Sequence, residues 1–243
     1  MSQKASAITR LSRNVKGVFF MSINQKERFS ALSHFAGAIG GLLGLILLVV
    51  MCKNRSDLLL VSFIYGLSAI FLFSASGLYH TKKKAEDEVS FWRKLDHLAI
   101  FFMIAGTYTV VSYIHLSGYW KIGIISAQWT LVFFGIIFKF LWLRAPRIFS
   151  TMIYLLMGWM AILPMKEFIT SMSGAALIFL LLGAFFYSTG AIIYAFKKPD
   201  ILPDKIGFHG VFHMFILLGG FMHFLMIVIT INNCTDFFML SFN

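Results

Sequence analysis

Three histidines in this sequence have the type and spacing of ligands to a single metal ion. His209 and His213 are four residues apart, so on a helix their side chains share one face, a turn apart. His80 lies far earlier in the chain, at the end of another apolar run. Neutral imidazole is a common metal ligand, and three of them leave the fourth position of a tetrahedral zinc ion free for water. The three residues therefore predict a Zn²⁺ site, if the fold brings the two segments together.

Two further polar residues are candidates for catalysis at such a site. Asp96 stands at the start of an apolar run, and its carboxylate is suited to hydrogen-bond water on the metal or to orient a ligand imidazole. Ser76 lies one helical turn before His80 on the same face. Asp96 has an alternative role as a carboxylate favoured by a helix dipole and paired with Lys94. The His209–His213 pair also has an alternative role, in which both are interfacial residues that hydrogen-bond lipid headgroups or loop carbonyls.

The elements that must position these residues are membrane-spanning helices. The chain has 243 residues, of which 59% are apolar and only 13% charged, whereas soluble domains are about one quarter charged. Mean hydropathy is +0.82. An apolar helix needs about 20 residues to cross the hydrocarbon of a bilayer. Seven runs qualify, with the fifth short and ending at Pro164, and their approximate limits are residues 32–51, 58–79, 95–114, 122–143, 149–163, 175–196 and 206–231.

Loop charge predicts how these helices are oriented. The loops on the side of the N-terminus hold sixteen of the 21 Lys and Arg residues, and the opposite loops hold four. The remaining one, Lys139, lies near the inner end of the fourth run and is expected to extend to the headgroups. The positive-inside rule then places the N-terminus in the cytoplasm and the C-terminus outside. We predict an all-α, seven-helix protein of the inner or plasma membrane, whose net charge of +11 indicates no nucleic-acid partner, because the basic residues are scattered.

This orientation puts the candidate site residues at one depth. Ser76 and His80 fall at the cytoplasmic end of the second run, Asp96 at the start of the third, and the His209–His213 pair at the start of the seventh. His34, near the start of the first run, shares that depth. Zinc suits these ligands because imidazole nitrogen binds it well and the expected cytoplasmic leaflet holds no cysteine. Polar groups are costly in lipid, so their shared depth favours a common function.

The other histidines have simpler expected roles. His223 follows His209 by about 21 Å along the same helix, which is too far to bind the same ion. It is either an interior histidine with its hydrogen bonds satisfied or part of a proton relay or second site. His97 is expected to face away from Asp96, its neighbour, and His115 to lie at the outer interface.

Small and sulfur-containing residues add two expectations about packing. Cys52 and Cys234 both follow apolar runs on the predicted outer side, where they form a disulfide or remain two free thiols. The first run carries a face of glycines suited to close helix packing in a membrane. These glycines are Gly37, Gly40, Gly41 and Gly44.

The sequence divides into three parts. Residues 1–28 are basic and have apolar residues at helical spacing, which is typical either of an amphipathic helix on an anionic leaflet or of a disordered basic tail. They lack the apolar core of a cleaved secretory signal. Residues 29–234 form the membrane domain, and residues 235–243 a short C-terminal tail.

Taken together, these residues resemble the hemolysin III family, the bacterial branch of the progestin and adipoQ receptor superfamily. The resemblance runs from Glu27 to about Phe224 and implies seven transmembrane helices with the N-terminus inside. It also implies zinc ligation by His80, His209 and His213. One departure is a serine at position 30, where bacterial members usually carry asparagine. The motifs, in chain order, are ERFSALSH at 27–34, SGLYH at 76–80, KLDH at 94–97, IAGTYT at 104–109 and HGVFH at 209–213.

The resemblance implies roles for the remaining site residues and a choice of functions. The aspartate matched by Asp96 contacts metal-bound water in relatives, and the serine matched by Ser76 lies beside it. Likeness of the superfamily to alkaline ceramidases favours a zinc-dependent hydrolase of a lipid amide or ester, with membrane lipids as substrate or ligand. The alternatives are a sensor or regulator with structural zinc, or a cytolysin as the family name suggests. Seven integral spans without a cleavable signal argue against a secreted toxin. No residue identifies a protein partner.

Overall fold

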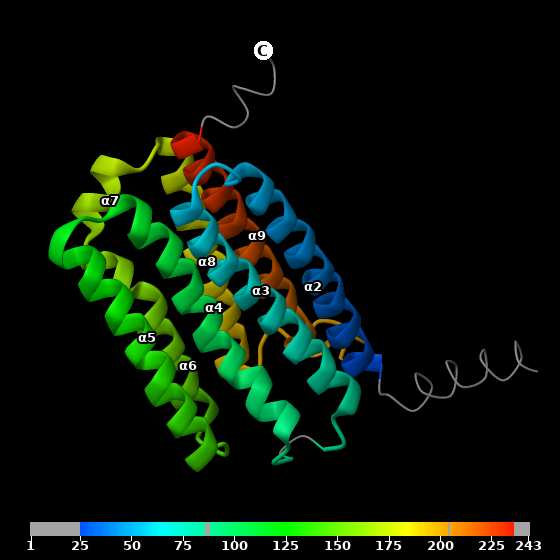
Figure 1. The fold of residues 1–243 in the computed structure, drawn as a ribbon. Helices are drawn as coiled ribbons and strands as arrows, with labels where there is room; N and C mark the ends of the chain where they lie inside the picture. The colour runs from blue at the N-terminus through cyan, green and yellow to red at the C-terminus, as the bar shows by residue number, and fades with distance from the viewer. Residues whose placement is uncertain (1–24, 86–87, 204, 236–243) are drawn as a thin grey trace, which may run out of the picture.

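A computed structural model describes residues 25–85, 88–203 and 205–235, and within these residues it contains helices and no strand. The predicted N-terminal amphipathic segment lies almost entirely outside the described residues, as does nearly all of the C-terminal tail. Figure 1 shows the helices as one bundle. Their bounds are α2 Gln25–Met51, α3 Ser56–Lys82, α4 Phe91–His115, α5 Gly118–Leu141, α6 Arg147–Gly158, the 3₁₀ helix η1 Trp159–Ile162, α7 Met165–Ser171, α8 Gly174–Phe196 and α9 Gly207–Thr235.

The helices pack mostly against their neighbours in the chain, and one distant pairing closes the bundle. Helix α3 packs on α2 and α4, α5 packs on α4, and α8 packs on α9. The distant pairing is α2 on α9, which brings the first and last described helices together. The start of α2 and the end of α9 lie at opposite ends of the bundle (Figure 1). Because α2 touches both α3 and α9, the ends of these three helices can share one site.

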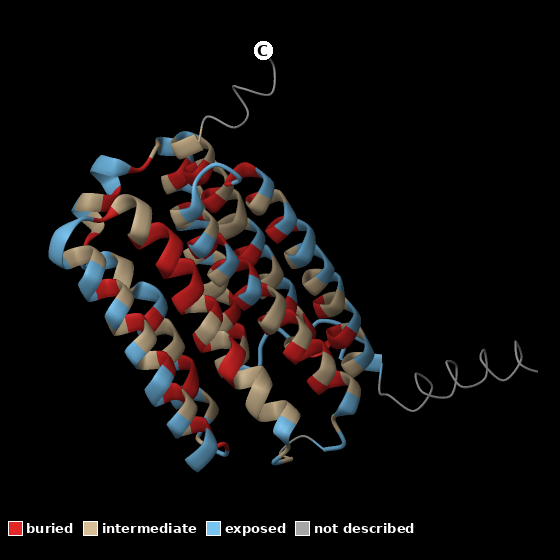
Figure 2. Ribbon diagram, in the orientation of Figure 1, coloured by how far each residue is buried: buried red, intermediate tan, exposed pale blue. Residues whose placement is uncertain are grey.

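The predicted all-α, multi-pass membrane architecture is confirmed. Six of the described helices are long and apolar enough to cross a membrane, and α6 with η1 and α7 forms a seventh candidate span. Exposed residues lie on the outer sides of the helices and buried ones on the sides that face the interior (Figure 2). Many of the exposed residues are large and apolar, such as Leu141 at 82% exposure, as expected where lipid is the solvent. The orientation of the two termini across the membrane stays a prediction.

The fifth span is broken rather than merely short. Its two parts are bent by 55° at Pro164, which has no N–H to continue a helical hydrogen-bond ladder. The Tyr108 hydroxyl from α4 donates to the carbonyl of Gly158 at 2.6 Å and accepts from the amide of Ala161 at 2.7 Å. Backbone groups freed inside a membrane must find partners. The Tyr108 hydroxyl is the hydrogen-bond partner of two such backbone groups, and it stabilises the broken span in this way.

Lys139 differs from its prediction. The side chain does not extend to the headgroups; it is fully buried, and its Nζ donates to the Ser150 hydroxyl of α6 at 2.7 Å. The ammonium group also lies near the rings of Phe138 and Tyr154. A hydroxyl acceptor and two aromatic faces replace part of the hydration that the ammonium group loses. The expectation of a headgroup contact was therefore wrong, because α6 offers these groups within the bundle.

The two cysteines lie at the same end of the bundle as separate thiols. Cys52 is buried and shares a hydrogen bond of 3.5 Å with the Ser62 hydroxyl. Burial raises the pKa of the Cys52 thiol, so it stays protonated at neutral pH. A contact between the start of α3 and the end of α9 comes instead from Arg55, whose Nη1 donates to the carbonyl of Cys234 at 3.4 Å.

Candidate metal centre

The three predicted metal ligands meet at one end of the bundle. His80 lies in the last turn of α3, and His209 and His213 lie in the first two turns of α9. The Nε2 atom of His209 lies 3.2 Å from that of His80 and 3.0 Å from that of His213. One ligand atom from each residue lies within 4.8 Å of the others. The structure thus brings together residues that the sequence separates by more than half the chain.

This arrangement fits a zinc ion. Zinc–nitrogen bonds of about 2.0–2.1 Å in tetrahedral geometry place ligand nitrogens about 3.3 Å apart, close to the two distances in the histidine cluster. His80 and His213 are each only 1% exposed. Three imidazole nitrogens facing one point cannot satisfy one another, since each neutral ring carries one donor and one acceptor. A cation at that point would satisfy all three.

Local sequence features explain how α9 presents its two histidines. Gly207 begins the helix at φ +68°, a left-handed conformation that glycine adopts without strain. The Asp200 carboxylate accepts a hydrogen bond of 2.6 Å from the amide of Phe208 and so satisfies one free donor of the first turn. Gly210 faces Phe29, and a Cβ at this position would lie 3.0 Å from that ring. The missing side chain lets the histidine-bearing turn approach α2.

A carboxylate that the sequence did not identify as a site residue orients His80. The Nδ1 atom of His80 lies 2.5 Å from Oε2 of Glu27, and Oε1 of Glu27 accepts a bond of 2.6 Å from Lys83 Nζ. With the Nδ1 proton directed to a carboxylate, the lone pair of His80 is at Nε2 and faces the cluster. Carboxylate–histidine pairs of this kind commonly hold metal ligands in place. The only sequence signal was that Glu27 opens the family-like motif of the first span.

Asp96 and Ser76 lie beside the cluster but outside the group of ligand atoms. Ser76 is buried on α3 and lies near the Asp96 carboxyl on α4. Asp96 is partly buried and also close enough to His80 to interact electrostatically. The alternative role of Asp96 paired it with Lys94. The Nζ atom of Lys94 lies instead 4.7 Å from the centre of the Phe140 ring. Asp96 therefore lies near His80, and its role in catalysis stays a prediction.

His34 adds a fourth imidazole to this end of the bundle. Its ring stacks on that of His213 with 3.8 Å between centroids, and its other neighbour is the Phe73 ring. The side chain is 3% exposed, and neither ring nitrogen has a hydrogen-bond partner among the described residues. The shared depth of His34 was predicted from the sequence; its contact with a metal ligand was not.

The remaining histidines lie outside the cluster. His223 lies with Nε2 3.3 Å from the carbonyl of Leu180, which agrees with the interior, hydrogen-bonded alternative. The backbone carbonyl of His97 accepts a hydrogen bond of 3.2 Å from the Tyr154 hydroxyl of α6. His115 lies at the other end of α4, with Nε2 3.2 Å from the Thr230 hydroxyl.

Comparison with known proteins identifies the family. The chain matches the family described as Haemolysin-III related over residues 22–224. This chain belongs to that family. It is 34% identical over 200 residues to the Hemolysin-3 homolog of Bacillus subtilis (strain 168), covering 81% of this chain and 90% of that protein. It is also 34% identical over 219 residues to Hemolysin-3 of Bacillus cereus, covering 89% of this chain and 93% of that protein.

Membership in the Haemolysin-III related family confirms the resemblance found in the sequence. The matched region contains Glu27, the three clustered histidines and Asp96. Together with six to seven apolar helices, it establishes a multi-pass membrane protein with histidines close enough to hold a metal ion. The division of the chain at residues 28 and 234 stays a prediction.

Proposed function

We propose that this Haemolysin-III related protein is a zinc-dependent hydrolase that cleaves an amide or ester bond in a membrane lipid. The observation that carries the proposal is the histidine cluster with a carboxylate beside it. The nitrogens of His80, His209 and His213 converge at distances suited to zinc, and the Asp96 carboxyl lies near His80 without being part of the ligand group. Three nitrogen ligands with a fourth position open is the usual composition of a catalytic zinc site.

The protein residues divide the work of hydrolysis among them. His80, His209 and His213 would hold the ion, and Glu27 fixes the ring of His80. When bound, zinc supplies a Lewis acid for the carbonyl oxygen and makes water more acidic. Asp96 accepts a proton from the attacking water and delivers it to the leaving nitrogen or oxygen as the bond to the carbonyl carbon breaks.

Ser76 is a positioning residue in this scheme. Its hydroxyl is buried on α3 and lies near the Asp96 carboxyl. A hydrogen bond from this hydroxyl would restrict the rotation of the carboxylate. Holding a catalytic group in the productive geometry lowers the entropy that is lost on reaching the transition state.

The surroundings of the cluster support a lipid as substrate. The site is made by helices that cross the membrane, and His209 is its most exposed ligand. The ring of His209 is flanked by those of Tyr194 and Phe212, at 5.8 Å and 5.6 Å between centroids. An apolar approach of this kind favours a substrate whose scissile group is joined to hydrocarbon chains. A ceramide-like amide is the first substrate to test.

The test is fatty-acid release from a ceramide-like lipid by zinc-loaded protein in nanodiscs. We expect release by the wild type and a rate at least about 100-fold lower for Asp96→Asn, with unchanged zinc content. Asp57→Asn is the matched control, since Asp57 lies at the opposite end of α3 and pairs with Arg55. Normal turnover in Asp96→Asn would rule out Asp96 as the base. Zinc-loaded wild type that cleaves neither lipid amides nor lipid esters would contradict the proposed hydrolase.

A further inference from the structure

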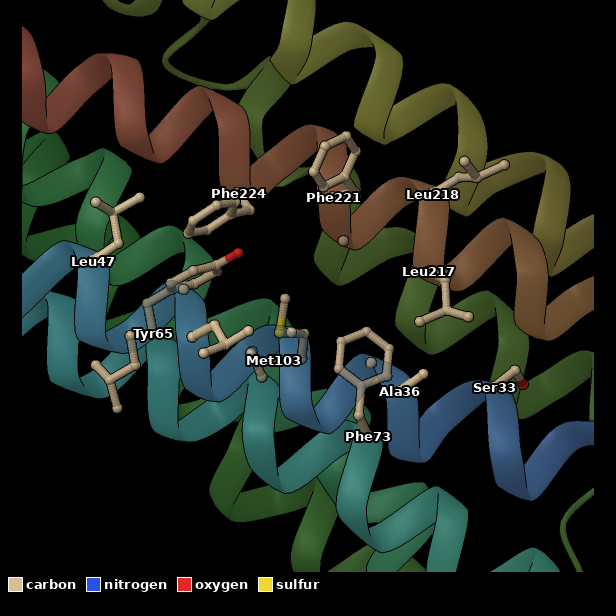
Figure 3. A pocket seen from close by; sticks show the side chains of 18 of the residues that line it. Ser33, Ala36, Leu47, Tyr65, Phe73, Met103, Leu217, Leu218, Phe221 and Phe224 are labelled. Carbon is tan, nitrogen blue, oxygen red and sulfur yellow. The ribbon is translucent and has the colours of Figure 1, made fainter.

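A cavity separate from the histidine cluster lies between α2, α3 and α9. Its volume is about 650 Å³, within the range of about 300–1,000 Å³ typical of small-molecule sites. Along α2 it extends from Ser33 to Leu47, a length of about 21 Å. Leu43 and Phe221, which also line it, are 61% and 53% exposed, so the cavity opens on the lipid side of the bundle. Figure 3 shows it between the ribbons of these helices.

The glycines of α2 create this space rather than only bringing helices together. A Cβ on Gly37 would lie 2.7 Å from the Leu217 side chain, and one on Gly44 would lie 2.9 Å from Phe224, so both positions contact α9 closely. A Cβ on Gly40, between them, would meet nothing within 4 Å. The predicted packing role therefore holds at Gly37 and Gly44, which contact α9, and at Gly41, which lies against α3, whereas Gly40 borders the hollow.

One polar group is directed into the hollow without a partner. Tyr65 of α3 is 3% exposed, and its hydroxyl has no hydrogen-bond partner among the described residues. The hydroxyl points into the cavity toward Phe224 (Figure 3). Tyr65 lies about 14 Å from the start of α3, below the membrane interface and out of reach of bulk water. An unpaired hydroxyl in such a place costs free energy unless a ligand hydrogen-bonds it.

We propose that this cavity binds one hydrocarbon chain of a neutral lipid, with a hydroxyl or ester carbonyl of that lipid hydrogen-bonded to Tyr65. The cavity is long, narrow and apolar, and it opens to the hydrocarbon of the bilayer. None of the described residues that line it is charged, so a carboxylate at this depth would remain uncompensated. A neutral head satisfies Tyr65 without that cost.

A lipid chain also fits the cavity better than a helix from a second copy. Helices α2 and α9 touch at both ends of the cavity, where His34 stacks on His213 and where Gly44 meets Phe224. A helix with its side chains is about 10 Å wide and cannot enter between two helices that are already in contact. The site is also distinct from the metal centre, because Phe73 and His34 lie between them.

The test is photolabelling in phosphatidylcholine nanodiscs with a diazirine derivative of cetyl alcohol. We expect saturable labelling of peptides from α2 and α9, competed by unlabelled cetyl alcohol and weaker for the corresponding fatty acid above neutral pH. Gly40→Phe fills the hollow and should reduce labelling at least about fivefold. Gly123→Phe is the matched control, because a Cβ on Gly123 of α5 also meets nothing within 4 Å. Tyr65→Phe removes only the hydroxyl and should weaken binding about three- to tenfold.

The outcomes separate this proposal from the proposed hydrolase and from other occupants. His209→Ala should label like the wild type, because the cavity does not include the metal centre. Equal labelling of wild type and Gly40→Phe would overturn the proposal, and normal binding by Tyr65→Phe would overturn the assigned hydrogen bond. A wild-type dimer that Gly40→Phe dissociates would assign the cavity to a second copy instead. Thermal melting of each variant shows whether it is folded.

Discussion

At the scale of single residues, the feature that most distinguishes this site is the unequal support of its three histidines. His80 is held by Glu27, which is itself paired with Lys83. His213 has no partner for Nδ1 among the described residues and is held by stacking against His34. The orientation of His80 therefore depends on a carboxylate from another helix, while that of His213 depends on packing.

This difference predicts the effect of replacing Glu27. Glu27→Gln keeps the size of the side chain but removes the charge that fixes the Nδ1 proton of His80. Loss of such a partner typically weakens metal binding about 10- to 100-fold, and we expect that decrease in a zinc titration against a competing chelator. Glu167→Gln, in α7 at the other end of the bundle, is the control. Unchanged affinity in Glu27→Gln would show that Glu27 does not support the site.

At the scale of helices, small residues decide how closely α8 and α9 approach. A Cβ on Gly183 of α8 would lie 2.0 Å from the ring of His223, which is held against the carbonyl of Leu180. Gly183→Ala should therefore lower stability by about 1–3 kcal/mol through overpacking, measured as a lower melting temperature. In contrast, Gly123→Ala should not destabilise the protein, because the position is open and alanine favours a helix.

A second substitution makes this prediction specific to the contact. The double variant Gly183→Ala with His223→Ala removes the ring that the new methyl group would strike, so part of the lost stability should return. A double variant no more stable than the sum of the two single changes would place the strain elsewhere.

At the scale of the whole molecule, loop charge predicts the orientation of the bundle in the membrane. The start of α2 and the end of α9 lie at opposite ends of the bundle. The basic residues of the described loops lie mostly at the end that holds the histidine cluster. We therefore expect a C-terminal alkaline phosphatase fusion to be active and a C-terminal green fluorescent protein fusion to be dark. The reverse pattern would place the metal centre at the outer face.

The interior of the bundle also predicts how the protein behaves in a bilayer. Apolar side chains from α2, α3, α4 and α9 form a continuous buried cluster. From this apolar core we predict that the described helices do not enclose an aqueous pore. Purified protein should therefore not release dye from liposomes in the absence of detergent. Rapid dye release in proportion to protein would instead support pore formation, as the name Hemolysin-3 of a relative suggests.

Topology made much of this site predictable from sequence alone. The lengths of the apolar runs and the loop charges placed His80, Asp96 and the His209–His213 pair at one depth. The helices bring the three histidines together, and Asp96 lies near His80. Contacts that depend on helix rotation and side-chain reach were not predictable in this way. Glu27 of α2 contacts His80 of α3, and Lys139 of α5 donates a hydrogen bond to Ser150 of α6. Both contacts depend on how the helices pack. Hydropathy carries no information about either contact.

The most direct test of the account is the metal content of the purified protein. Elemental analysis of wild type beside His209→Ala should show about one zinc per chain in the wild type and little in the variant, with His223→Ala retaining the metal as a control. X-ray absorption at the zinc edge should show three nitrogen ligands at about 2.0–2.1 Å. Protein that binds no zinc when supplied with it, or His209→Ala that binds zinc as well as the wild type, would contradict a metal centre at the meeting point of α3 and α9.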